Sequence, residues 1–270
     1  MIRDESGGRN TGCFWSKRAN ARRSHPAFHW SKNLRSSRHT AEFIKEHNFR
    51  LSSVFALFWN LLKSHLPDEV LGPFEAYLVE NQMCRMDGDG EKAQKARGIY
   101  MAEWGSECVE FDNAELAPPS GVAGCNYARA IHREKQGQKW AFSWTTSRRE
   151  GMAGGSFYQA IYGVKVLQAP NTMIAWMPEH DHGTSLLDWS PDKKDDVPPF
   201  AQAGIALVTS TRLASTWKKY LAGRNFAEAE AEWVASMEAD VEEKCGDELC
   251  TFCLEDGYEC NDDLCPICIL

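Results

Sequence analysis

Seven short runs of β-forming residues follow one another from about residue 125, with no helical stretch between them. They are NYARAIH, KWAFSWTT, SFYQAIYG, VKVLQ, TMIAWM, HGTSLL and AGIALVTS. β-Branched and aromatic residues favour strands, and the Gly, Pro and Asn residues between the runs favour turns. Strands connected in this way pair antiparallel, so the block predicts a sandwich or a barrel.

Helical patterns lie on both sides of this β-rich block. Apolar residues recur at helical spacing from Leu51 to Leu66, and Pro67 is expected to end that helix. A second helical stretch, DEVLGPFEAYLVEN, is expected to kink or restart at Pro73. Two further helices are expected over ASTWKKYLAG and NFAEAEAEWVASMEADVEEK. We therefore predict an α+β fold: a double-stranded β-helix, or jelly roll, whose barrel is buttressed by helices and can hold a small ligand at one mouth.

Charge divides the chain into three parts. The net charge is −8, but residues 1–40 contain nine Lys and Arg against two acids, whereas residues 226–270 contain one Lys against fourteen acids. We expect a basic, disordered arm over 1–40, a helix-buttressed barrel over 41–225, and an acidic helix with a Cys-rich tail over 226–270. Two solvated tails are the simplest interpretation, and a basic arm that contacts phosphate is the alternative.

Neither end of the chain, nor its most apolar segment, indicates a membrane. The N-terminal MIRDESGGRN has no apolar core, so we do not expect it to act as a signal peptide. The longest apolar run, VFALFWNLL, is too short to span a bilayer. We expect a soluble, intracellular and nuclear protein without a membrane partner.

The stretch ARAIHREKQG places His132 and Glu134 two residues apart at the end of a β-like run. Alternate residues of a strand lie on one face, so the imidazole and the carboxylate could bind the same metal ion. A solvated surface pair is the alternative, since an isolated H-x-E is common. A third ligand can come from PEHDHGTSL, and we favour His182 over His180 because HGTSLL alternates like a strand. Two His and one carboxylate are the ligands of non-haem Fe(II) oxygenases.

The same residues carry a resemblance to a known family. APPSGVAGCNYARAIHREKQGQKWAFSWTTSRREG and GGSFYQAIYGVKVLQAPNTMIAWMPEHDHGTSL resemble the fungal branch of the TET/JBP-type 2-oxoglutarate and Fe(II)-dependent dioxygenases. The resemblance extends from about Leu51 to Tyr220. It implies a double-stranded β-helix that binds Fe(II) and 2-oxoglutarate and oxidises a methyl group on a base in DNA. It also implies that the iron ligands are His132, Glu134 and His182.

The chain departs from this family's pattern at two points. The usual motif is H-x-D, and Glu134 is one methylene longer than Asp. The family also places an Arg or Lys on the last strand, where it binds the far carboxylate of 2-oxoglutarate. Here the polar loop DWSPDKKDDVPPFAQ intervenes, and the first Arg after His182 is Arg212. We predict Arg212 for this role and Arg148 as the second candidate, with a structural or surface role as the alternative for each.

Other residues near the motif have simpler interpretations. Tyr127 and Arg129 are expected on the strand face opposite His132, as support. His180 and Asp181 are expected either to orient His182 or to be exposed turn residues. We expect three tryptophans in the barrel core rather than as base-stacking platforms: Trp140, Trp144 and Trp176.

An internal repeat occupies the C-terminal segment. CGDELCTFC and CNDDLCPIC both have the spacing C-x4-C-x2-C. Within them a C-x2-C-x11-C-x2-C set predicts a structural zinc site at Cys250, Cys253, Cys265 and Cys268. Disordered reactive thiols and disulfides are the alternatives.

Three functions are compatible with the sequence. The leading hypothesis is a TET/JBP-type dioxygenase that oxidises a methylated base in DNA, with a basic arm that contacts phosphates through Arg22, Arg23, Lys32, Arg35 and Arg38. The net charge of −8 does not favour strong binding to DNA. A catalytically inactive barrel that acts as a binding module is the first alternative, and an oxygenase of a small molecule is the second.

Overall fold

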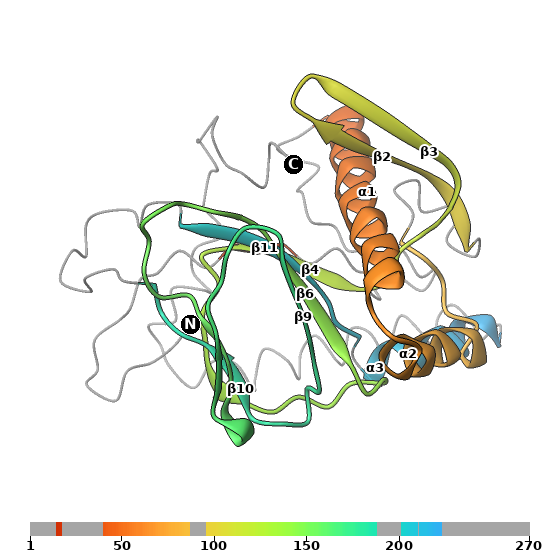
Figure 1. Ribbon diagram of the computed structural model, residues 1–270. Coiled ribbons are helices and arrows are strands. Elements are labelled where there is room, and N and C mark those ends of the chain that lie inside the picture. The colour runs from red at the N-terminus through yellow and green to blue at the C-terminus, as the bar shows by residue number, and fades with distance from the viewer. Residues whose placement is uncertain (1–14, 18–39, 87–95, 188–200, 210, 223–270) are drawn as a thin grey trace, which may run out of the picture.

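The computed structural model describes residues 15–17, 40–86, 96–187, 201–209 and 211–222 (Figure 1). This part of the chain has an α+β fold in which every strand pair is antiparallel. Its helices are α1 (Ala41–His65), α2 (Asp68–Glu80) and α3 (Thr211–Leu221). No helix among these residues is long and apolar enough to cross a membrane.

The strands form two sheets and a separate hairpin. The larger sheet has the order β1 (Trp15–Lys17), β4 (Gly121–Cys125), β11 (Gln202–Leu207), β6 (Ala141–Arg148) and β9 (Thr172–Trp176). The smaller sheet has the order β5 (Arg129–His132), β10 (His182–Thr184), β7 (Phe157–Gln159) and β8 (Val164–Val166). The hairpin consists of β2 (Arg97–Trp104) and β3 (Glu107–Glu115). Each of the seven predicted β runs overlaps one of these strands.

The two sheets face one another, and aromatic side chains join their inner faces. Phe157 of the smaller sheet and Trp176 of the larger sheet lie with ring centroids 5.3 Å apart, beside the buried Ala141. The structure corrects the expectation of a barrel, because no strand pairing closes the sheets into one within the described ranges. Two facing sheets bury their inner faces without closure, as in a sandwich.

Helices α1 and α2 cover the outer face of the larger sheet (Figure 1). The Phe74 ring lies 5.4 Å from that of Phe142, and the Phe58 ring lies 5.8 Å from that of Trp144. The fully buried aromatic side chains of this core are Phe55, Phe58, Trp59, Phe74 and Phe142. Burial of each large apolar side chain stabilises the fold by about 1.5–3 kcal/mol. The helix-covered face of the larger sheet is therefore the main core of the protein.

The ends of α1 follow from its capping residues. Thr40 precedes the helix, and its Oγ1 accepts a hydrogen bond from the N–H of Phe43 at 3.2 Å. The helix therefore begins before the apolar periodicity that predicted it from Leu51. Pro67 follows its C-terminus, as expected, because proline cannot continue a helix.

A kink or a restart was expected at Pro73, and helix α2 runs through this residue without a restart. Proline removes one helical N–H donor, but Phe74 and Leu78 on the same helix are buried in the main core. This packing supports the continuous helix.

The hairpin of β2 and β3 was not predicted from the sequence. Its Tyr100 is buried against Ala56 of α1. Glu115 joins the hairpin to α1, since its carboxylate accepts from Trp59 Nε1 at 3.1 Å and from Lys63 Nζ at 2.5 Å. Burial tends to raise the pKa of Glu115, but these hydrogen bonds and the nearby positive charges outweigh it and hold the pKa below its usual value.

Several predictions concern residues outside the described ranges. They are the Cys-rich tail with its zinc set, the acidic helix after residue 225 and most of the basic arm. Within the arm, Trp15–Lys17 form the edge strand β1, paired with β4, which differs from the expected disorder at these three residues.

Candidate metal centre

His132 and His182 come from neighbouring strands of the smaller sheet. They are direct partners in the antiparallel pairing of β5 with β10, and their ring centroids lie 4.3 Å apart. Residues directly opposite one another across two strands have adjacent side chains. The sheet thus brings together two imidazoles separated by fifty residues in the sequence.

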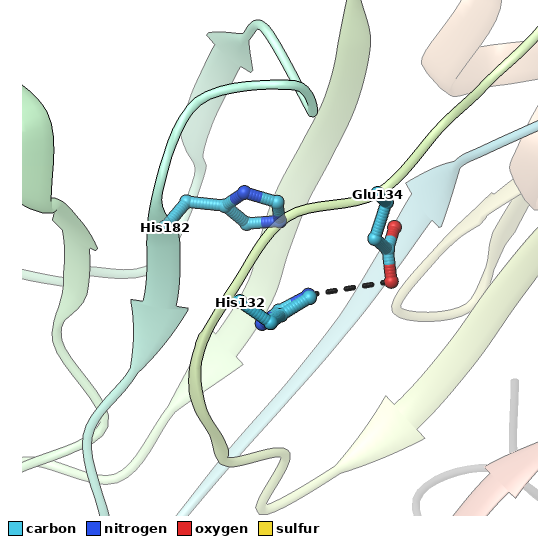
Figure 2. Close-up of side chains that lie close together, drawn as sticks. All are labelled: His132, Glu134 and His182. Carbon is cyan, nitrogen blue, oxygen red and sulfur yellow. Dashed lines mark ion pairs between the residues drawn. The ribbon is translucent and has the colours of Figure 1, made fainter.

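Glu134 follows β5 in the loop and completes the cluster. Its backbone N–H donates to the carbonyl of Pro178 at 2.8 Å, which fixes this loop beside the segment leading to His182. Its Oε1 lies 3.3 Å from Nε2 of His132, and Figure 2 shows the His182 ring directed toward the same place. One ligand atom from each of the three residues lies within 4.8 Å of the others.

Hydrogen bonds assign the tautomer of both imidazoles. Nδ1 of His132 lies 2.7 Å from the carbonyl oxygen of Ala130, and Nδ1 of His182 lies 2.8 Å from that of His180. A carbonyl can only accept, so each Nδ1 carries a proton, and Nε2 is the atom of each ring that remains to bind a metal ion. Backbone partners of this kind orient histidines that bind metals.

Burial favours the neutral form of His182. Only 4% of this residue is exposed. Burial lowers the pKa of His182 below its usual value, in spite of its hydrogen bond to the His180 carbonyl. A neutral imidazole is the form that binds a metal ion.

A cavity of about 610 Å³ lies between the sheets beside the three side chains. Strands of the larger sheet line it with small and polar residues that include Gly124, Ser143, Thr145 and Gly204. Phe157 and Trp176 close it next to His182, with ring centroids 6.1 and 5.8 Å from the imidazole. The arrangement can hold a divalent ion with two nitrogen donors and one carboxylate, with space for a ligand next to it.

Arg129 lines the cavity together with His132, which corrects the expectation that it lies on the opposite face. The strand pairing explains the difference. His182 pairs with His132, and Thr184 pairs with Arg129. Arg129 is three residues from His132 along β5, whereas Thr184 is only two residues from His182 along β10, so β5 contains one extra residue. This β-bulge moves Arg129 to the side of His132. Tyr127 also lines the cavity.

The two residues predicted to bind 2-oxoglutarate are placed differently. Arg148 lies outside the cavity lining, and its guanidinium donates to Gln202 Oε1 and to the carbonyls of Met152 and Gly154, the latter two at 2.7 and 2.8 Å. These contacts hold the loop after β6. Arg212 is the second residue of α3, and its side chain is outside the described part of the structure. The charged cavity-lining side chains besides Glu134 are Arg129 and Lys135.

The other predicted neighbours of His182 lie outside the ligand cluster. Asp181 accepts two hydrogen bonds from Arg133, at 2.6 and 2.8 Å, on the exposed side of the two ligand segments. His180 Nδ1 lies 3.1 Å from the Tyr162 hydroxyl. Of the three tryptophans expected in the core, Trp140 and Trp144 pack against the main core, and Trp176 is buried in the small cluster with Phe157. Trp144 and Trp176 also line the cavity.

No protein-family model matches this chain, and no curated protein matches it in sequence. Functional inference therefore depends on the geometry and chemistry of the site.

Proposed function

We propose that the chain is a Fe(II)- and 2-oxoglutarate-dependent dioxygenase of the TET/JBP type that oxidises a methylated base in DNA. The observation that carries the proposal is the cluster of His132, Glu134 and His182 beside a cavity. Two imidazoles and one carboxylate on one side of a metal leave other positions free, and this donor set is characteristic of non-haem Fe(II) oxygenases.

The course of the chain supports a double-stranded β-helix as the finer description of the fold. From β4 to β7, successive strands alternate between the larger and the smaller sheet, and they do so again from β8 to β11. A jelly roll has two sheets and this crossing of the chain between them. In this proposal the metal ligands lie on the smaller sheet, and the larger sheet forms the opposite wall of the cavity.

The donor groups fit Fe(II). Each Nδ1 is engaged with a backbone carbonyl, which leaves Nε2 of each ring as the donor atom for a metal ion. Glu134 supplies the negative charge that a divalent cation favours. When bound, Fe(II) would supply the activation of O₂ that couples conversion of 2-oxoglutarate to succinate and CO₂ with oxidation of a substrate methyl group.

The residues around the cluster hold the ligands and restrict water. Phe157 and Trp176 pack against His182 and shield one side of it. Arg133 and Asp181 form an exposed bidentate pair on the outer side of these segments. The polar side chains of Ser143 and Thr145 on the far wall offer hydrogen bonds to a ligand in the cavity.

Two features support a nucleic acid as the substrate. The cavity volume of about 610 Å³ is within the usual range for small-ligand sites and leaves room for a base flipped out of the duplex. The stretch from 129 to 139, which contains two of the ligands, has four basic residues against one acid. Lys135 and Lys139 are exposed there and can contact phosphates.

Anaerobic titration with Fe(II), with and without 2-oxoglutarate, tests the metal and the co-substrate together. We expect stoichiometric Fe(II) binding and a weak visible absorption band that appears only when both are present. His180→Ala is the matched control for ligand variants, since His180 belongs to the same segment but not to the cluster. Failure of the wild-type protein to bind Fe(II) would contradict the proposal and favour the binding module.

Succinate release separates the two candidate enzyme activities. With O₂ and 2-oxoglutarate, we expect succinate release to rise on addition of DNA that contains methylated bases and to remain at its basal rate with unmethylated DNA. Release that responds only to free methylated nucleosides, and not to DNA, would instead identify an oxygenase of small molecules.

A further inference from the structure

Arg129 and His132 approach the same oxygen atom of Glu134. Nη1 of Arg129 donates to Oε1 of Glu134, and this same oxygen lies 3.3 Å from Nε2 of His132. Among the described residues, the other oxygen, Oε2, has one long contact, at 3.5 Å, from Nε2 of Gln136. The carboxylate oxygen best placed to bind a metal beside His132 is thus already paired with a guanidinium.

The inward position of Arg129 follows from the bulge in β5 and from Gly183 opposite it. A Cβ atom at Gly183 would lie 2.9 Å from the carbonyl oxygen of Arg129 and 3.1 Å from the carbonyl carbon of Ala130. Such close backbone approaches leave no room for a side chain. Gly183 therefore permits the bulge, and the bulge aims Arg129 at the metal ligand.

The longer side chain of Glu, compared with Asp, helps the carboxylate of Glu134 to reach Arg129. Arg129 and Glu134 are five residues apart, on opposite sides of His132. Both side chains must extend to meet at the cluster, and an Asp at position 134 would have a shorter reach. Around the cluster, the positive charge of Arg129 balances the negative charge of Glu134.

We propose that Arg129 is a cation built into the centre that competes with the metal ion for Glu134. This inference rests on the metal centre of the proposed function. A divalent ion that binds His132 and His182 must share Oε1 of Glu134 with the guanidinium or displace it. Like charges at short distance repel, so Arg129 weakens binding of the metal and keeps it exchangeable.

Calorimetric titration with Mn(II) tests the proposal, because Mn(II) is divalent, stable in air and accepts nitrogen and carboxylate donors. The variants are Arg129→Gln, Arg129→Lys and the matched control Arg133→Gln. Arg133 is also a cation beside the ligands, but its guanidinium pairs with Asp181 and does not touch Glu134. Circular dichroism establishes that each variant is folded.

We expect Arg129→Gln to lower the Mn(II) dissociation constant about tenfold, equivalent to ~1.4 kcal/mol. Arg133→Gln should change it by less than about twofold, since exposed ion pairs contribute little. Arg129→Lys keeps the positive charge and should stay close to the wild-type dissociation constant.

Three results would overturn the proposal that Arg129 competes with the metal ion for Glu134. The first is equal or weaker binding by Arg129→Gln, which would make Arg129 a support for the ligand. The second is equal tightening in Arg133→Gln, which would reflect a general loss of charge. The third is equal tightening in Arg129→Lys, which would exclude charge as the cause. A wild-type protein that binds no Mn(II) would overturn the metal centre itself, so the two failures are distinguishable.

Discussion

The larger and the smaller sheet differ in what covers their outer faces. Helices α1 and α2 pack on the larger sheet, where Phe142 and Leu207 have no exposed surface. The smaller sheet has strands of only three or four residues, and on it Ile131 and Val164 are 52% and 46% exposed. The proposed ligands His132 and His182 belong to this thinly covered sheet. The difference indicates that one sheet supplies most of the stability and the other supplies the site.

The largest effect is expected from a change in the main core. Phe142→Ala removes a fully buried ring that packs on Phe74, and we expect a loss of about 3–5 kcal/mol in the free energy of unfolding. Urea denaturation followed by circular dichroism measures it. The matched control is Val164→Ala on the smaller sheet, where we expect a change within about 0.5 kcal/mol. Equal losses at both positions would break the comparison between the sheets.

The second effect concerns the site and not the fold. His132→Ala and His182→Ala each remove one of three donors, and we expect Fe(II) affinity to fall by more than about a hundredfold. The free energy of unfolding should change by less than ~2 kcal/mol, since the main core is untouched. Anaerobic calorimetry and urea denaturation give the two quantities. His180→Ala should retain wild-type affinity, and stoichiometric Fe(II) binding by both ligand variants would refute the cluster.

The third effect concerns the length and the charge of the side chain at position 134. Glu134→Asp withdraws the carboxylate by about one bond length and should weaken Fe(II) binding about tenfold, equivalent to ~1.4 kcal/mol. Glu134→Gln keeps the length but removes the charge that a hard cation favours, and should weaken binding further. We expect the order of affinity Glu, Asp, Gln in anaerobic titrations. Identical affinities would mean that the carboxylate does not bind the metal.

The smallest effect is a pH dependence in the part of the core next to the hairpin. The pKa of Glu115 is lowered in the folded protein, so its contribution is fully present above the usual carboxyl pKa and disappears as pH falls through the lowered value. We expect Glu115→Gln to cost about 1 kcal/mol at pH 7 and less at acidic pH. Urea denaturation at several pH values measures this. A cost that does not change with pH would show that the charge of Glu115 is not involved.

Features that depend on the residues of one segment were predicted from the sequence, whereas features that depend on packing between segments were not. The β runs and the ligand spacing are local patterns, and strands occur at each predicted run. Lack of apolar periodicity before Leu51 concealed the start of α1, which Thr40 caps. The hairpin of β2 and β3 depends on packing against α1 and has no strong signal of its own.

At the site, too, features that depend on contacts between distant residues were not predicted. Alternation along β5 placed Arg129 on the wrong face, because a bulge is a property of two paired strands and not of one. Gly183 was the available signal, but its partner lies fifty residues away. Arg148 had the right charge for an anion, yet its contacts with two backbone carbonyls and Gln202 follow only from the folded loop.

The packing of Trp176 against His182 has an optical consequence. The indole lies 5.8 Å from the imidazole, so an ion held by His182 would sit within a few side-chain widths of a fluorophore. Paramagnetic ions quench emission at such short range, whereas Zn(II) does not. The emission lost on changing Trp176 to Phe would then isolate the signal of this one indole from those of the other nine. If the cluster binds a paramagnetic ion, the fluorescence of Trp176 would therefore report its occupancy.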